Sequence, residues 1–140
     1  IAADGPERPR LQAEAARLGL ADRVTFPGFA APGDVLAHAD VFALSSDTEQ
    51  MPYSVIEAMA SGLPVAATRV GDVPAMLAPE NAAHLVQPGD AIGLTRTLDD
   101  LLTGRDAAAA IGAANRDRAA ATFDVRVMAA AWAHVLEGGC

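Results

Sequence analysis

Apolar and polar residues form blocks along the chain that suit strands and helices in turn. Continuous apolar runs of strand length occur at residues 41–45 and 64–68, and such runs are typical of parallel strands buried on both faces. Apolar residues at helical spacing follow them. This alternation predicts an α/β fold, a Rossmann-like parallel sheet with helices on both faces. The expected strands end at Ala3, Phe26, Leu44, Thr68 and Val86.

The helical patterns carry their own start and stop signals. An amphipathic stretch over residues 10–20 contains Gly19, and glycine is typical of the position just past a helix. Asp34 and Asp90 stand where a helix N-cap is expected. Further helices are expected at residues 54–61, 73–77, 90–102, in a run ending near Thr122, and at 125–136.

Composition narrows the class of protein. The 140 residues suit one compact domain, and 51% hydrophobic residues are enough for a core. A net charge of -8 argues against a general nucleic-acid or anionic-membrane surface. The single cysteine, Cys140, provides neither a disulfide framework nor a cysteine metal site, so we expect a cytoplasmic protein. The opening IAADGP reads as the end of a strand, which indicates a piece of a longer protein.

Two glutamates mark one edge of the predicted sheet. Ligands of parallel sheets bind beyond the carboxyl ends of the strands, and Glu49 and Glu57 follow the strand that ends at Leu44. The residue before Pro52 is biased to extended backbone, and proline suits the first turn of a helix. Glu49 is therefore expected in a loop and Glu57 on the helix. If the loop bends back, both carboxylates can reach one ligand.

Each glutamate also has an ordinary structural interpretation. Ser54 and Glu57 have the S-x-x-E spacing of a capping box, in which Glu57 only fixes the start of the helix. Glu49 can be a solvated loop carboxylate, and Asp47 with Glu49 resembles a metal-binding pair. The residues of this stretch alone leave these alternatives open.

The neighbouring motifs extend the comparison to a known family. Residues 57–65, EAMASGLPV, and 86–90, VQPGD, follow the two glutamates in an order that resembles the C-terminal, donor-binding half of GT-B glycosyltransferases. The resemblance is to retaining glycosyltransferase family 4, "glycosyl transferases group 1", and covers nearly the whole chain. It implies transfer of a sugar from a nucleotide-diphosphate donor to an acceptor, with retention at the anomeric carbon and no metal or other cofactor.

The resemblance also assigns roles to residues of the E-x7-E stretch. Glu49 would be the catalytic residue that holds hydroxyls of the donor sugar, and Glu57 would bind the ribose. A helix N-terminus stabilises phosphate without a metal, so the N–H groups near Pro52 would face the diphosphate. The contacting donor-binding residues of this stretch would be Glu49, Gln50, Met51, Pro52, Tyr53, Ser54 and Glu57. Family members often have Gly-Phe-Gly after the first glutamate, and Gln-Met-Pro here puts the choice of donor in question.

Four further residues complete the implied donor site. Gly28 and Phe29 lie in a loop that would hold the base, with Phe29 either stacked on it or part of the core. Gly5 and Gly71 lie on loops where backbone can approach a ligand closely, although either can be an ordinary turn glycine.

The implied partners are a UDP-, GDP- or ADP-sugar and an N-terminal domain that lies outside this chain. Residues 1–123 would form the nucleotide-sugar-binding domain, and the helix in 124–140 would cross back to that N-terminal domain. We expect no nucleic-acid partner, and membrane association only through the other domain. The piece by itself would be inactive.

Three other functions share parts of the pattern. A non-catalytic nucleotide-sugar-binding or regulatory module would have the same site. A nucleotide-sugar epimerase would need further acid–base residues that this stretch lacks. A dinucleotide-binding Rossmann domain would need a G-x-G-x-x-G turn after a strand, which the chain does not contain.

Overall fold

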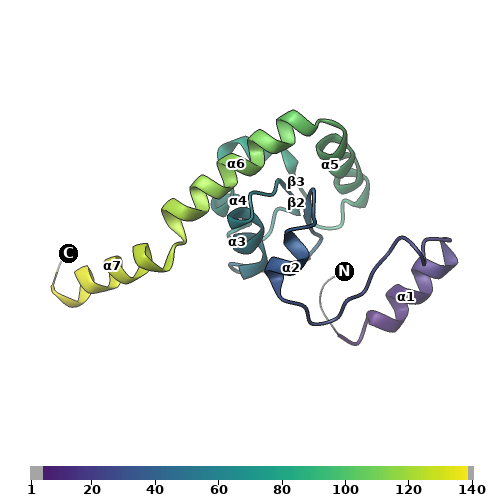
Figure 1. Cartoon of the computed structure of the whole chain (residues 1–140), viewed down its shortest axis with the longest axis horizontal. Coiled ribbons are helices and arrows are strands. Elements are labelled where there is room, and N and C mark those ends of the chain that lie inside the picture. Colours follow the sequence, from purple (N-terminus) through teal and green to yellow (C-terminus); the bar gives the residue numbers. More distant parts are fainter. Residues whose placement is uncertain (1–4, 139–140) are drawn as a thin grey trace. The chain divides into compact units, whose positions relative to one another are not determined.

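The computed structural model describes residues 5–138, and the chain divides into two compact units, Ile1–Val35 and Leu36–Cys140 (Figure 1). The strand expected to end at Ala3 lies outside the described residues, as does Cys140. The domain boundary expected after residue 123 stays a prediction, whereas contacts within the chain divide it before Leu36.

The first unit is built around helix α1, Arg8–Arg17. A proline in its first turn suits the helix start, because the missing N–H would have no partner inside the helix there. Leu18 caps the other end, and Gly19 follows with a φ of 69°. Only glycine adopts that left-handed backbone readily, so the predicted stop at Gly19 is confirmed.

The strand predicted at residues 23–26 is wrong. The N–H groups of Arg23 and Val24 both donate to the carbonyl of Leu20, which makes a turn. The Phe26 carbonyl accepts a hydrogen bond from the Arg8 guanidinium at 2.6 Å. A strand is held by ladder hydrogen bonds to a neighbouring strand, and the described part of this unit contains none. The apolar pattern of the segment could not reveal that local and side-chain bonds replace the ladder.

Helix α2, Pro32–Leu36, begins before Asp34, the residue expected to be its N-cap. The Ala31 carbonyl accepts from the N–H groups of Asp34 and Val35, so Ala31 takes the cap position. Asp34 therefore lies in the first turn of the helix, and its predicted role as N-cap is wrong. Proline at the first helical position explains the earlier start.

The second unit contains a parallel sheet of three strands in the order β1–β2–β3. Strand β1 is Phe42–Leu44, β2 is Val65–Thr68 and β3 is Leu85–Val86. The first two confirm the apolar runs of the sequence. The third is shorter than expected, because Pro79–His84 forms a 3₁₀ helix, η1, before it.

Helices cover both faces of this sheet. Alternate residues of a strand point to opposite faces, and β2 is buried along its whole length. Val65 and Ala67 join the core that contains Val55, Ala58 and Met59 of helix α3, Tyr53–Ala60. Ala66 joins a second core with Leu101 of helix α5, Ala91–Thr103, and with residues of helix α6, Arg105–Thr122. The predicted α/β architecture with a doubly covered parallel sheet is confirmed.

A pair of buried asparagines ties η1 and α6 to strand β2. The Asn81 amide donates to the Val65 carbonyl at 2.7 Å and accepts from the Val65 N–H at 2.9 Å, as a neighbouring strand would. The Asn115 amide donates to Asn81 Oδ1 and to the Leu63 carbonyl, and accepts from the Ala78 N–H. Both side chains are fully buried. Every hydrogen bond of this asparagine pair therefore forms away from water, where an unmade bond is most costly.

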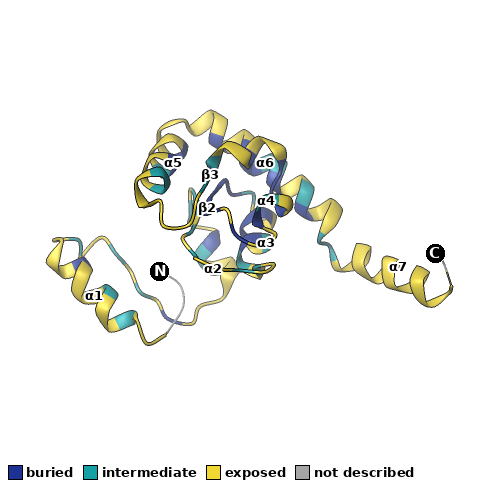
Figure 2. Ribbon diagram, turned by 180° about the vertical axis from the view of Figure 1, so that it is seen from behind, coloured by how far each residue is buried: buried dark blue, intermediate teal, exposed yellow. Residues whose placement is uncertain are grey.

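The two remaining helices are α4, Val73–Met76, and α7, Val125–Leu136. Asp124 caps α7 by accepting from the Arg126 N–H, and the Arg126 guanidinium bonded to this carboxylate lowers the pKa of Asp124 to about 2. No residue of α7 is buried, and Figure 2 shows the helix exposed along its length. Met128, Trp132 and Leu136 lie at helical spacing and are all exposed, and the described residues pack nothing over them.

One predicted helix start is confirmed. Asp90 accepts from the Gly93 N–H at 2.8 Å and caps α5 as predicted.

No helix within residues 5–138 is both long enough and apolar enough to cross a bilayer.

Replacing Asn115 tests the asparagine pair. Asn115→Ala removes three hydrogen bonds and leaves the buried Ala78 N–H, Leu63 carbonyl and Asn81 amide without that partner. We expect the free energy of unfolding, measured by denaturant titration, to fall by about 3 kcal/mol. Asp117→Ala, on the exposed side of the same helix, is the control and should change it by less than about 0.5 kcal/mol. Equal effects of the two changes would contradict the role of the pair.

Candidate functional site

The carboxyl ends of the three parallel strands lie at one edge of the sheet, and their loops carry the predicted site. A hollow of about 160 Å³ opens there. It is lined by Ser45 and Asp47 after β1, by Thr68 of β2, and by Gly89, Asp90, Ala91 and Leu94 after β3. Glu49 and Glu57 are not among its lining residues. The hollow therefore lies at the predicted edge of the sheet, but the two glutamates do not line it.

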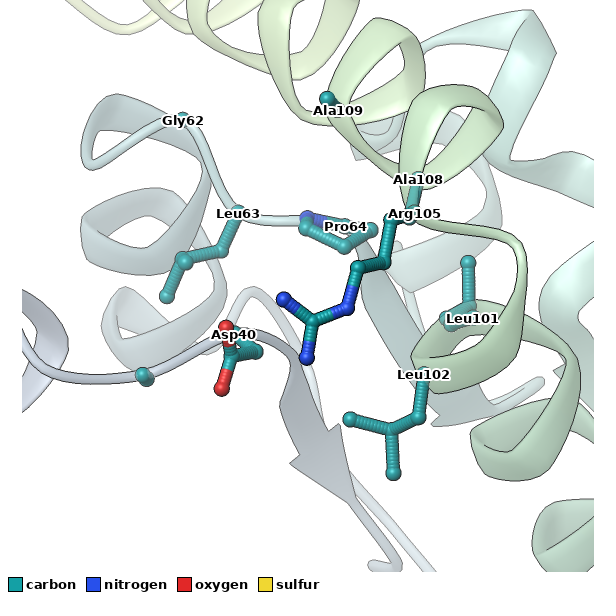
Figure 3. Close-up of a pocket in the computed structure, with 10 residues that line it drawn as sticks. Asp40, Gly62, Leu63, Pro64, Leu101, Leu102, Arg105, Ala108 and Ala109 are labelled. Carbon is teal, nitrogen blue, oxygen red and sulfur yellow. The ribbon is translucent and has the colours of Figure 1, made fainter.

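A larger hollow of about 270 Å³ lies at the opposite edge of the sheet (Figure 3). Asp40 precedes β1 and Pro64 precedes β2, so this hollow lies at the amino ends of the strands. The Arg105 side chain extends toward Asp40 across it (Figure 3). Ligands of parallel sheets bind beyond the carboxyl ends of the strands, on the loops that lead into the helices. Size alone therefore does not make this hollow the functional site.

Glu49 is held in place inside its loop. The Ser46 hydroxyl donates a hydrogen bond to Glu49 Oε1 at 2.7 Å, and both side chains are half-buried. The interpretation of Glu49 as a freely solvated loop carboxylate does not describe this arrangement. A carboxylate with one oxygen bonded by a neighbour still presents acceptor sites on both oxygens to a ligand.

Helix α3 begins directly after this loop. Pro52 is the N-cap, with φ -70° and ψ 120°, and no side chain caps the helix. The Val55 N–H donates to the Pro52 carbonyl. Helix geometry leaves the N–H groups of Tyr53 and Ser54 without a partner inside the helix, and they mark its positive end. Proline was expected in the first turn, and it takes the cap position one residue earlier.

The capping box predicted at Ser54 and Glu57 does not form. Ser54 is the second residue of the helix, whereas a capping-box serine precedes the helix. Glu57 lies further along α3 with its side chain exposed, and its carbonyl accepts from the Ser61 hydroxyl. The competing structural role of the Glu57 carboxylate is thereby removed, and the group is available to a ligand.

The loop after β2 packs against the loop after β1. Gly71 has a φ of 49°, and a Cβ there would collide with the carbonyl groups of Glu49 and Gln50. The N–H of Asp72 donates to the Gln50 carbonyl at 2.8 Å. The need for glycine at this position comes from the Glu49–Gln50 backbone. Direct contact of Gly71 with a donor stays a prediction.

The residues expected to hold the base belong to the first unit. Phe29 is 91% exposed, so the alternative that it is a core residue is wrong. Gly28 is buried with a φ of 74°, and a Cβ on it would lie 3.2 Å from the Arg8 guanidinium. The Gly5 carbonyl accepts from the Arg8 N–H. Donor contacts of Gly5, Gly28 and Phe29 stay predictions.

Three residues of this region were missed by the sequence reasoning. Ser46 holds the Glu49 carboxylate, the Thr68 hydroxyl donates to the Ser46 carbonyl, and Asp72 fixes Gln50. One signal was present, because Ser46 and Glu49 have the same S-x-x-E spacing as Ser54 and Glu57. Which pair forms a side-chain hydrogen bond depends on where helix α3 begins. Ser46 and Glu49 both precede the helix, and this pair forms the bond.

The predicted metal pair finds no further ligands near it. Within residues 5–138 no group of three or more histidine, cysteine, aspartate or glutamate side chains is arranged to hold a metal ion. The Glu49 carboxylate is instead bonded by the Ser46 hydroxyl.

The fold matches that of solved GT-B glycosyltransferases. Sucrose-phosphate synthase from Thermosynechococcus elongatus matches with a TM-score of 0.87 and 31% identity, over 97% of this chain and 35% of that one. Anabaena HepE in complex with UDP-glucose matches with a TM-score of 0.88 and 26% identity, over 98% of this chain and 40% of that one.

Residues 1–104 match the family "Glycosyl transferases group 1", and the chain belongs to that family. A GDP-mannose-dependent alpha-(1-6)-phosphatidylinositol monomannoside mannosyltransferase of Mycobacterium tuberculosis is 34% identical over 99% of this chain and 38% of its own length. A 2-deoxystreptamine N-acetyl-D-glucosaminyltransferase of Streptomyces fradiae is 36% identical over 74% of this chain and 25% of its own. The chain thus spans less than half of these relatives.

Substituting Gly71 tests how tightly the two loops are packed. Gly71→Ala places a methyl group against the Glu49 and Gln50 carbonyls and strains a positive φ, so we expect a loss of about 3 kcal/mol in unfolding free energy. Gly89→Ala is the matched control, since its φ of 80° is equally unfavourable but nothing lies within 4 Å of the added carbon. Gly89→Ala should lose only about 1 kcal/mol. Similar losses at both positions in denaturant titrations would show that the loops do not press on each other.

Proposed function

We propose that this chain is the donor-binding half of a retaining glycosyltransferase, which takes a UDP-, GDP- or ADP-sugar and uses no metal or other cofactor. The observation that carries the proposal is the position of Glu49. Its carboxylate is held by Ser46 in the loop that leads directly to the uncapped N-terminus of α3. Membership of the family supports the proposal, and so does the resemblance to HepE, which has been solved with UDP and with UDP-glucose.

The diphosphate would lie at the N-terminus of α3. The N–H groups of Tyr53 and Ser54 point out of the first turn, where the helix dipole is positive. In the transfer step the bond from the anomeric carbon to the diphosphate oxygen breaks, and the leaving oxygen takes the electron pair. The acceptor oxygen bonds to the same face of the sugar, and its proton passes to an oxygen of the leaving diphosphate. Fixed N–H donors at the leaving group stabilise the charge as it develops.

The two glutamates would bind the two sugars of the donor. Glu49 accepts from hydroxyl groups of the transferred sugar, and Glu57, exposed on α3, accepts from the ribose hydroxyls. A hydrogen bond to a charged group contributes about 1.5–3 kcal/mol. Gln50, Met51 and Pro52 follow Glu49 in the same loop and would set the shape of the sugar pocket.

The remainder of the enzyme would come from another part of a longer protein. We propose that an N-terminal domain supplies the acceptor site and basic side chains for the diphosphate, and that the present chain transfers no sugar alone. The exposed apolar side chains Met128, Trp132 and Leu136 support a role for α7 in contacting that domain. We further propose a cytoplasmic location, where nucleotide sugars are available as donors.

Alanine substitutions distinguish the proposed roles of Glu49 and Glu57. Glu57→Ala should weaken UDP and UDP-glucose equally, by about 10- to 100-fold, because the ribose is common to both. Glu49→Ala should weaken UDP-glucose by a similar factor and leave UDP unchanged. Calorimetric titration measures both, with GDP and GDP-mannose as further probes. Glu80→Ala, an exposed glutamate of η1, is the matched control and should change neither affinity.

If both glutamate variants bind UDP and UDP-glucose as the unsubstituted chain does, the assignment of the site is wrong. If the unsubstituted chain binds no nucleotide sugar at all, the proposed function fails.

A chelator tests whether a metal takes part. We expect the affinity for UDP-glucose to be the same with and without excess EDTA, because helix N–H groups take the place of a cation at the diphosphate. The control is a titration in added magnesium, which should also leave the affinity unchanged. A loss of binding in EDTA that magnesium restores would favour the metal pair of Asp47 and Glu49 instead.

A further inference from the structure

We infer that Ser46 is a positioning residue, which orients the Glu49 carboxylate for the sugar of the donor, and that Thr68 holds Ser46 in turn. The inference rests on the proposed function of Glu49. Two hydrogen bonds carry it. The Thr68 hydroxyl donates to the Ser46 carbonyl at 2.6 Å, and the Ser46 hydroxyl donates to Glu49 Oε1 at 2.7 Å.

These bonds connect the loop to the buried end of strand β2. Thr68 is the last residue of β2 and is only 3% exposed. Strand β1 pairs with β2 as far as Leu44 and Ala67, so backbone pairing between the two strands ends one residue before Thr68. The Thr68 hydroxyl bond continues the connection into the loop after β1. Ser46 is thereby fixed by a buried strand of the sheet.

The Ser46 hydroxyl then limits the freedom of Glu49. A glutamate in a loop samples several rotamers, and each must be restricted when a ligand binds. A carboxylate already oriented by a neighbour loses less freedom on binding and presents its remaining acceptor sites in one direction. Ser46 would therefore raise the affinity for the sugar without touching it.

Glu57 provides an internal comparison. Its exposed carboxylate lies on a helix and has no hydrogen-bonded neighbour of this kind among the side-chain bonds of the described residues. Loss of the Ser46 hydroxyl should consequently change the sugar-dependent part of donor affinity and leave the nucleotide part alone. A general loss of stability would weaken both parts together.

The experiment compares Ser46→Ala with Ser45→Ala, the same substitution one residue earlier at an exposed serine. The first readout needs no ligand: three-bond couplings of the Glu49 side chain, measured by NMR on the isotope-labelled chain. We expect one dominant rotamer in the unsubstituted chain and in Ser45→Ala, and averaged couplings in Ser46→Ala. Thr68→Val should cause partial averaging, and Thr68→Ser, which keeps the hydroxyl, should cause none.

The second readout is the ratio of the dissociation constants of UDP and UDP-glucose. Ser46→Ala should reduce the gain in affinity from the glucose about 10-fold, which corresponds to about 1.4 kcal/mol, with UDP unchanged. Ser45→Ala should leave the ratio as it is. Ser46→Thr, which retains a hydroxyl, should recover at least half of the loss.

The outcomes separate the two proposals. If Ser46→Ala leaves Glu49 in one rotamer, or leaves the ratio unchanged while the unsubstituted chain binds both probes, the positioning role is overturned. If the unsubstituted chain binds neither probe, the proposed function fails and the sugar-directed role of Ser46 fails with it. The couplings then still decide whether Ser46 orients the carboxylate.

Discussion

The buried pair Asn81 and Asn115 holds the start of strand β2, the central strand of the sheet in the second unit. A central strand needs hydrogen-bond partners on both edges, and β3 pairs only with the last part of β2. At Val65 the Asn81 amide supplies both the donor and the acceptor that a strand would. Asn115 reaches the same region from α6. The Asn81 side chain thus supplies the hydrogen bonds that β3 does not make with Val65, and Asn115 holds Asn81 in place.

Strand β2 in turn holds the loop that carries Glu49. Thr68 at the end of β2 holds Ser46, and the turn that follows brings Gly71 and Asp72 against Glu49 and Gln50. The loop after β1 is therefore shaped largely by its neighbour strand. Only the hydrogen bond from Ser46 to Glu49 is local in sequence. The position of the Glu49 carboxylate therefore depends on residues some twenty positions further along the chain.

Sequence patterns could predict the parts of this fold that are governed by local rules. Continuous apolar strands, the N-cap at Asp90 and the stop at Gly19 all follow from short stretches, and the structure contains them. The segment 23–26 has the same apolar character, but whether a strand forms depends on a partner elsewhere in the chain. The capping box at Ser54 failed for a similar reason, because the helix starts two residues earlier, with Pro52 as its N-cap, and Ser54 then lies inside the first turn. The asparagine pair joins residues 34 positions apart, and no periodicity reports such a contact.

The close approach of Gly71 to the Glu49–Gln50 backbone has a consequence for how this scaffold can change. Residue 71 has almost no room to vary, since any side chain would push the neighbouring loop. The backbone at Glu49 and Gln50 is held by Gly71 and Asp72 of the neighbouring loop, so substitutions in residues 49–52 and 69–72 must be compatible with one another. Engineering libraries that randomise only the segment around the first glutamate would sample mostly misfitted loops, whereas joint libraries over both segments would preserve their fit.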